Sequence, residues 1–180
     1  MSKSHRPRAL KLGRLGNGYP CISRPSGFRL ASAAAICLEE RKHEVGVLIG
    51  VSGHCEITFS LHWPETTGQL RREWADPQEA TENGAVAVAI LLVDMITDYH
   101  VVERAYKTTG IDYWLGKKDA FLLQKSARLE VSGIRQGDGK QVDSRVRAKL
   151  KQSEQSKVTR LPIIVIVVEF GAPTAVMVIK

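Results

Sequence analysis

Two carboxylates of this 180-residue chain are placed so that they can meet on one face of a sheet. Asp112 and Glu130 lie in apolar runs, 111–115 and 127–131, that read as neighbouring strands. Carboxylates on adjacent strands that share a face can bind a divalent cation such as Mg²⁺ or Mn²⁺, which prefers oxygen ligands. Such an ion polarises a scissile phosphate and activates water. The predicted chemistry is therefore phosphodiester hydrolysis.

Strand alternation predicts which side chains accompany the second carboxylate. In the run from Arg128 to Ser132, Glu130 shares a face with those two end residues, while Leu129 and Val131 point to the other side. The sequence therefore predicts one polar and one apolar face for this strand.

A buried helix precedes these strands. Asp76 is suited to the N-cap, Pro77 to the first helical position, and Glu79 lies three residues after the cap. Apolar side chains cover most of the helix that we expect over 76–97. Gly84 lowers helix propensity by roughly 1 kcal/mol relative to Ala, which close backbone packing would justify.

The remaining elements complete a mixed α/β fold. Further strands are expected at 100–104, 163–170 and 175–179, and a helix at 142–153. We expect one domain over 31–180, with the core at 76–180 and an N-terminal antiparallel β meander of two or three strands at 31–75. Residues 1–30 are interrupted by Gly and Pro and are expected to form a loose basic arm.

The order of helix, three strands, helix and strand over residues 76–180 resembles the core of the PD-(D/E)XK, or restriction-endonuclease-like, nuclease superfamily. The residues that carry the resemblance are Glu82 on the helix, Asp112 on the second strand and Glu130 on the third. The resemblance implies that these three acids assemble around one or two Mg²⁺ ions and that the chain hydrolyses nucleic acid.

The chain departs from this family at one position. The family usually has a Lys two residues after the third acid, where this chain has Ser132. A Ser can hydrogen-bond a ligand or water but has no positive charge to stabilise a phosphate transition state. Lys125, Arg128 or Lys149 could supply that cation; otherwise the fold serves binding without catalysis.

Basic residues gather in two segments. The chain has 26 Lys and Arg and 19 Asp and Glu, for a net charge of +7. Residues 1–30 have seven basic residues and no acid, and residues 135–160 have eight basic residues and three acids. Basic margins around an acidic middle suit a protein that binds a polyanion. The candidate nucleic-acid-binding residues are Arg6, Arg8, Arg145, Arg147, Lys149 and Lys151.

These patterns support two hypotheses. The first is a Mg²⁺-dependent DNA endonuclease, as a homodimer or within a larger complex in genome defence or repair, with Glu82, Asp112, Glu130, Ser132 and Lys125 in its site. The second is a catalytically inactive module that binds nucleic acid or scaffolds a complex. Residues 33–63 could instead form the functional half by binding another protein. DNA is favoured over RNA.

The number of cysteines and the length of the apolar runs indicate the cellular compartment. The odd count of three Cys without a CxxC pair favours a reduced, cytoplasmic protein. The longest apolar run, 85–93, is far shorter than the ~20 residues that span a bilayer. We therefore expect no membrane association.

Overall fold

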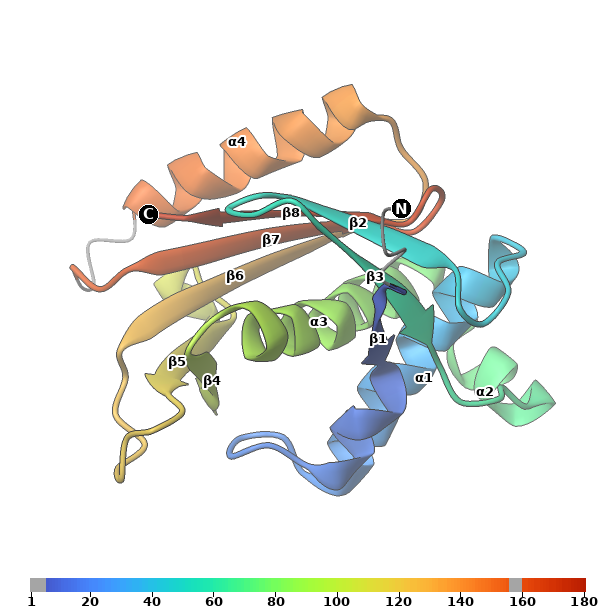
Figure 1. Cartoon of the computed structure of the whole chain (residues 1–180), viewed down its shortest axis with the longest axis horizontal. Helices are drawn as coiled ribbons and strands as arrows, with labels where there is room; N and C mark the ends of the chain where they lie inside the picture. The colour runs from blue at the N-terminus through green and yellow to red at the C-terminus, as the bar shows by residue number, and fades with distance from the viewer. Residues whose placement is uncertain (1–5, 156–159) are drawn as a thin grey trace, which may run out of the picture.

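A mixed eight-stranded sheet forms the centre of the molecule, with helices on both faces (Figure 1). The computed structural model describes residues 6–155 and 160–180. The strands are β1 (Arg8–Lys11), β2 (Leu48–Gly53), β3 (Ile57–His62), β4 (Tyr99–Arg104), β5 (Tyr113–Lys117), β6 (Ala127–Ile134), β7 (Ile163–Glu169) and β8 (Thr174–Ile179). The helices are η1 (Leu12–Asn17), α1 (Arg24–Glu40), α2 (Gly68–Glu73), α3 (Pro77–Ile96), η2 (Lys107–Thr109) and α4 (Gly139–Gln155).

The strand order across the sheet is β1-β3-β2-β8-β7-β6-β5-β4. Three pairs are parallel, namely β1 with β3, β2 with β8, and β6 with β7. The other four neighbouring pairs are antiparallel. The pairing of β2 with β8 therefore joins the N-terminal strands to the C-terminal ones. All the strands of the described residues belong to one continuous sheet.

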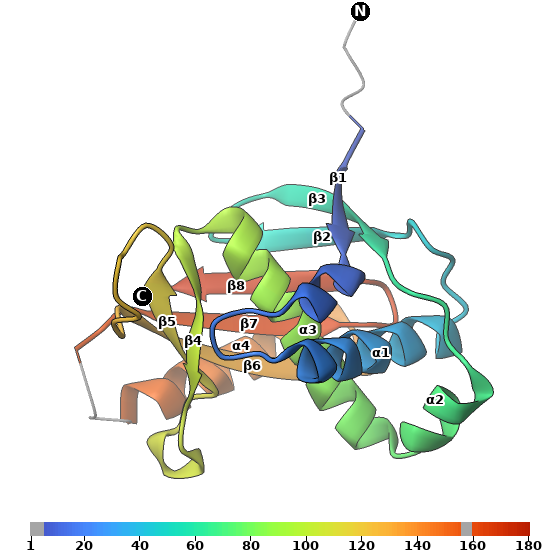
Figure 2. The same ribbon diagram turned by 90° about the horizontal axis from the view of Figure 1, so that it is seen from below.

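The main core lies between the sheet and the helices α1 and α3, which cross each other on the same face (Figure 2). Gly84 of α3 is the point of closest approach, since a Cβ there would lie 3.0 Å from the Cα of Ala34 on α1. The predicted reason for Gly84 is confirmed. The predicted capping is also confirmed, because Asp76 accepts hydrogen bonds from the backbone N–H groups of Gln78 and Glu79 at 2.8 and 3.3 Å.

The opposite face of the sheet is covered by α4 (Figure 1). Val142 and Val146, one turn apart, are buried against Val167 of β7, with the partly buried Leu150 continuing the apolar stripe. Arg145 and Lys149 each follow one of these valines by three positions. They therefore lie beside the stripe, where α4 meets the neighbouring strand β6.

The prediction of a loose arm over residues 1–30 is wrong from residue 6 onward. Leu10, Leu12 and Leu15 have no exposed surface, because β1 pairs with β3 and η1 packs against α1. Two of the basic residues are ion-paired with the body, Arg14 with Asp94 and Arg29 with Glu73 and Glu79. Residues 1–5 lie outside the described residues.

The meander predicted for residues 31–75 is partly wrong. Its first ten residues, 31–40, belong to α1, whose alanines and Ile36 are buried against α3. Ser23 caps this helix by accepting from the backbone N–H of Ser26 at 3.4 Å. The strands β2 and β3 do form an antiparallel pair, as predicted. None of the described helices is both long enough and apolar enough to cross a membrane.

Candidate functional site

The strand β6 runs beyond its neighbour β5 and leaves part of its edge open. β5 pairs with β6 only as far as Leu129, at Tyr113. Beyond that pair, the carboxylate of Asp112 takes the place of a strand, because its Oδ2 accepts from the backbone N–H of Val131 at 2.8 Å. Asp112 also donates its own backbone N–H to the carbonyl of Leu129 at 2.9 Å. Its position is thus fixed by sheet hydrogen bonds.

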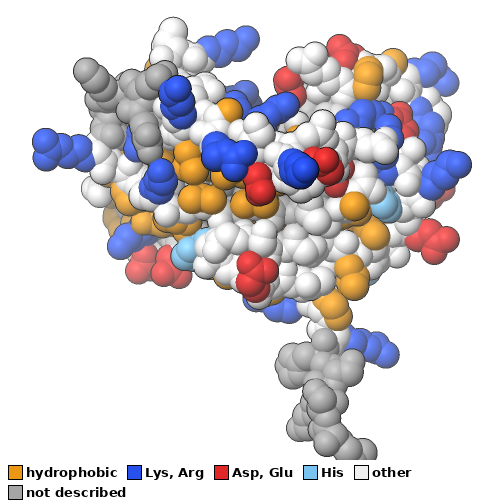
Figure 3. Space-filling model, turned by 90° about the horizontal axis from the view of Figure 1, so that it is seen from above, with side chains coloured by type: hydrophobic (Ala, Val, Ile, Leu, Met, Phe, Trp, Pro, Cys, Tyr) orange, Lys and Arg blue, Asp and Glu red, His pale blue; other side chains and the backbone are white. Residues whose placement is uncertain are grey.

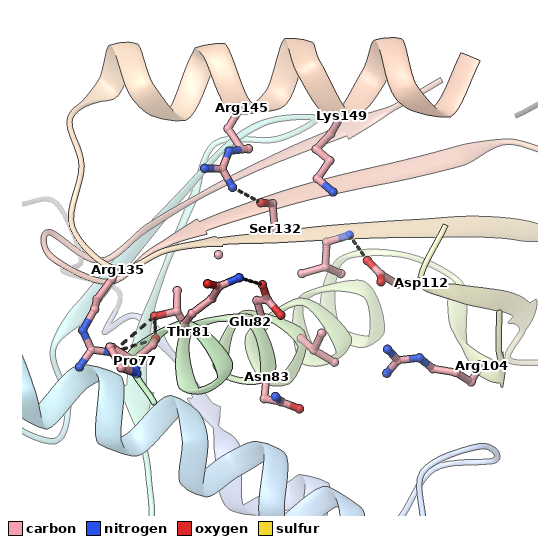
Figure 4. Close-up of a pocket in the computed structure, with 14 residues that line it drawn as sticks. Pro77, Thr81, Glu82, Asn83, Arg104, Asp112, Ser132, Arg135, Arg145 and Lys149 are labelled. Carbon is pink, nitrogen blue, oxygen red and sulfur yellow. Dashed lines mark hydrogen bonds between the residues drawn. The ribbon is translucent and has the colours of Figure 1, made fainter. Parts of the chain in front are cut away.

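A pocket of about 600 Å³ lies at this open edge, between α3 and α4 (Figure 4). Charged groups reach it from every wall: Glu82 from α3, Arg104 from β4, Asp112 from the start of β5, and Arg145 and Lys149 from α4. The remaining lining residues are Pro77, Gln78, Thr81, Asn83, Val86, Val131, Ser132, Gly133 and Arg135. The pocket therefore combines an acidic floor with basic walls.

Gly133 lets α3 approach the strand at this point. A Cβ on Gly133 would lie 2.5 Å from the backbone oxygen of Thr81, which is closer than real contacts allow. The helix wall of the pocket is thus in direct backbone contact with β6.

Glu130 lies beneath the pocket and is 3% exposed. Its Oε1 accepts a hydrogen bond from the ammonium Nζ of Lys149 at 2.6 Å. The pKa of Glu130 is raised to about 7, mainly by burial and then by repulsion from the nearby carboxylate of Asp112, while Lys149 opposes both effects. The carboxyl groups of Asp112 and Glu130 and the ammonium of Lys149 therefore form a compact cluster with little access to solvent.

The polar face of β6 is organised as predicted. Leu129 and Val131 belong to the main core, whereas Glu130 and Ser132 point to α4. The hydroxyl of Ser132 accepts from Nη1 of Arg145 at 2.9 Å. The two cations of α4 thus bond successive polar positions of the strand.

Of the three cations that could replace the missing Lys, Lys149 alone is in place. Lys125 pairs with Glu103 at 2.7 Å and lies over the ring of Trp114, outside the pocket. The guanidinium of Arg128 donates to the carbonyl of Leu161. The placement of Lys125 in the site is therefore not supported by its contacts.

Glu82 lines the pocket but does not complete a three-carboxylate cluster. It is exposed on α3 and accepts from the amide Nε2 of Gln78 at 3.1 Å. Within residues 6–155 and 160–180, no three His, Cys, Asp or Glu side chains are grouped so as to hold a metal ion. The structure brings together Asp112 and Glu130, and leaves Glu82 on the adjacent wall.

The predicted basic residues divide between the pocket and other surfaces. Arg145 and Lys149 line the pocket, whereas Arg147 and Lys151 are exposed elsewhere on α4. Figure 3 shows Lys and Arg side chains scattered over the α4 side of the molecule. Arg6 and Arg8 lie at the start of the described chain, and Arg8 is on β1, the edge strand opposite β4 in the sheet order. Helix periodicity explains the division of α4, because residues two apart point in nearly opposite directions.

Two arginines of the pocket were not predicted. Arg104 is paired with Tyr113 in the β4–β5 hairpin, next to Asp112, and its guanidinium lies 4.8 Å from the Tyr113 ring centroid. Arg135 follows β6, donates to Thr81 at 3.4 Å and forms an ion pair with Glu40. The hairpin register is the signal that would have placed Arg104 beside Asp112.

Comparisons of the chain with models of protein families, with curated proteins and with solved structures give no significant match.

Proposed function

We propose that this chain is a divalent-metal-dependent nuclease, a divergent restriction-endonuclease-like enzyme that hydrolyses phosphodiester bonds. One observation carries the proposal: Asp112 and Lys149 line a pocket with basic walls at the open edge of β6, and the buried carboxyl group of Glu130 lies beneath it, bonded to Lys149. Lys149 supplies from α4 the positive charge that Ser132 lacks on the strand.

The two carboxylates fit one Mg²⁺ or Mn²⁺ ion. Mg²⁺ is commonly held by one or two carboxylates, with substrate phosphate oxygens and water completing its shell. Asp112 uses Oδ2 for the backbone of Val131, and Glu130 uses Oε1 for Lys149. The two carboxyl groups also lie close enough to share a proton, and a cation would take the place of that proton. A bound ion would polarise the phosphate and lower the pKa of an attacking water.

The basic side chains of the pocket supply positive charge for binding the phosphate and for stabilising its transition state. The ammonium of Lys149, 2.6 Å from Glu130, stays at the carboxylate pair and faces a phosphate that enters the pocket. Arg104 and Arg145 approach from opposite walls and can hold phosphate oxygens on either side. Fixed cations of this kind stabilise negative charge as it grows on the phosphate.

Cleavage assays with matched variants test the proposal. Circular single-stranded DNA, supercoiled plasmid and RNA are incubated with purified protein and Mg²⁺ or Mn²⁺. We expect Asp112→Asn, Glu130→Gln and Lys149→Met to lower the cleavage rate by roughly 10² or more, by analogy with loss of one transition-state donor. Lys151→Met and Asp143→Asn, which change exposed positions of α4 outside the pocket, should leave the rate unchanged.

Two results would contradict the proposal. One is cleavage that survives both Asp112→Asn and Glu130→Gln. The other is the absence of cleavage on all three substrates with either metal.

A second function is favoured by the Lys149–Glu130 ion pair itself. Lys149 already balances part of the charge of the buried carboxylate, so the site is organised without a metal. A nuclease-like module that binds nucleic acid, or scaffolds a complex, would keep this ion pair and the basic walls. Nucleic-acid binding in EDTA that is unchanged by Asp112→Asn, together with no cleavage, would favour this alternative.

A further inference from the structure

A smaller hollow lies next to the pocket on the side of β4. This hollow, which we call the Tyr113 hollow, has a volume of about 270 Å³. It shares Asn83 and Arg104 with the pocket. Its other lining residues are Cys21, Ile22, Ser26, Arg29, Leu30 and Tyr113.

On the other side, the pocket borders the N-terminal half of α4. A second hollow of about 460 Å³ there shares Gly133, Arg135 and Arg145 with the pocket and is also lined by Gln141 and Ser144. We call it the Gln141 hollow. The three neighbouring hollows form a row across the open edge of β6, which we call the groove.

Two guanidinium groups stand along this groove without a carboxylate partner. Arg104 donates to the hydroxyl of Tyr113 at 2.8 Å, and Arg145 donates to Ser132 at 2.9 Å. Neither forms an ion pair within the described part of the chain. They stand on opposite walls, so the groove offers phosphate contacts on both sides of Asp112.

The Tyr113 hollow has the chemistry of a site for a planar base. Ile22 and Leu30 provide apolar contacts, and the planar guanidinium of Arg104 lines the hollow. Unpaired bases stack on arginine planes and aromatic rings and hydrogen-bond through their edges. Ser26 and Asn83 place a hydroxyl and an amide in the lining for such an edge.

We infer that the groove binds a single-stranded polynucleotide, with one unstacked base in the Tyr113 hollow and its backbone continuing past Asp112 into the Gln141 hollow. A base within a duplex is stacked and paired, so extracting it has a free-energy cost that an unpaired strand avoids. A strand that follows this row of hollows would bring its internal phosphodiester bonds to the carboxylates. This inference rests on the proposed function and adds the strandedness of its substrate.

Filling the Tyr113 hollow tests the inference by binding alone. Ser26 is exposed on α1, so Ser26→Trp places an indole in the hollow with little change to the core. Gln152→Trp, at an exposed position of α4 outside the groove, is the matched control. Affinities are measured in EDTA for labelled oligodeoxythymidylate, oligouridylate, an abasic strand of equal length, and a duplex containing the oligodeoxythymidylate.

The expected pattern is specific. One of the two base-bearing single strands should bind more tightly than the duplex, and which one distinguishes DNA from RNA. Ser26→Trp should weaken that binding roughly 5- to 100-fold, as loss of one stacked base does, and should leave the abasic strand unaffected. Gln152→Trp should change neither affinity. If Ser26→Trp lowers the melting temperature, Cys21→Phe fills the same hollow from another wall and should give the same pattern.

Two results would overturn the inference. They are duplex binding as tight as that of both single strands, and equal weakening of base-bearing and abasic strands by the filling variants. Base-dependent binding without any metal-dependent cleavage would reject the nuclease proposal and keep the inference. Cleavage of duplex plasmid alone, with no affinity for single strands, would keep the nuclease proposal and reject the inference.

Discussion

The two faces of β6 differ in what they bury, and the difference separates stability from chemistry. Leu129 and Val131 face α3 and join the main core. Glu130 and Ser132 are almost equally inaccessible, at 3% and 9% exposure, but bond to charged side chains of α4. Burial of apolar groups stabilises a fold, whereas burial of a carboxylate opposes folding even when it is paired. One strand therefore combines a stabilising face with a destabilising one.

The largest effect is expected on the apolar face. Leu129→Ala removes a side chain with no exposed surface from the main core. Loss of transfer energy and the cavity left behind should lower the free energy of unfolding by about 2–5 kcal/mol. Urea denaturation measures this change. A loss of less than about 1 kcal/mol would show that the face does not hold the fold together.

A substitution on the polar face should instead raise the free energy of unfolding. Glu130 has a pKa raised from 4.5 to about 7, so the folded state holds its proton between these values while the unfolded state releases it. Stability therefore falls as the pH rises from about 4.5 to about 7. Glu130→Gln keeps an acceptor for Lys149 but cannot ionise. It should raise the free energy of unfolding above pH 7 by at most about 3 kcal/mol.

Denaturation at several pH values checks this prediction. The difference between Glu130→Gln and the parent chain should disappear below about pH 4.5, where both are neutral at this position. Mg²⁺ should raise the melting temperature of the parent chain above pH 7 and have little effect on the variant, because binding to the folded state stabilises it. A variant less stable than its parent at pH 8 would contradict the assignment of Glu130 as a destabilising charge.

The smallest effect on stability is expected at the rim of the pocket. Arg145 is exposed and makes one hydrogen bond, to Ser132. Arg145→Gln should change the free energy of unfolding by less than about 1 kcal/mol. It should reduce nucleic-acid affinity and lower the slope of log affinity against log salt by about one.

Arg147→Gln is the matched change on the same helix, outside the pocket. It should leave both affinity and salt slope nearly unchanged. Equal effects of the two substitutions would indicate that α4 binds nucleic acid through general charge and not through the pocket.

The same contrast explains what the sequence could predict. The helix α3 and the alternation in β6 were predicted correctly because local capping and a period of two report directly on burial. The fold of residues 8–30 was not predicted, because Gly and Pro residues at such density are typical of a loose arm. There, Ser23 and Pro25 begin α1, and Gly27 is needed because its Cβ position lies 1.9 Å from the carbonyl oxygen of Leu15.

The proximity of Asp112 and Glu130 was predictable, whereas the position of Glu82 and the choice of cations were not. Asp112 and Glu130 follow from neighbouring strands, whereas the choice of Lys149 over Lys125 depends on how α4 lies across the sheet. Arg104 reaches the pocket through the hairpin register, which no local pattern specifies. Tertiary placement of long basic side chains is thus the part that local sequence signals leave open.

The hydrogen bond from Val131 to Asp112 has a consequence for how this site can vary. The carboxylate bonds the strand two residues after Leu129, where the pairing of β6 with β5 has ended, so the point at which β5 begins sets where this edge opens. An extra residue inserted between Asp112 and β5 would shift the acid by one residue along β6 and would turn it to the other face of the sheet. The place of this carboxylate is therefore encoded by strand register as much as by residue type.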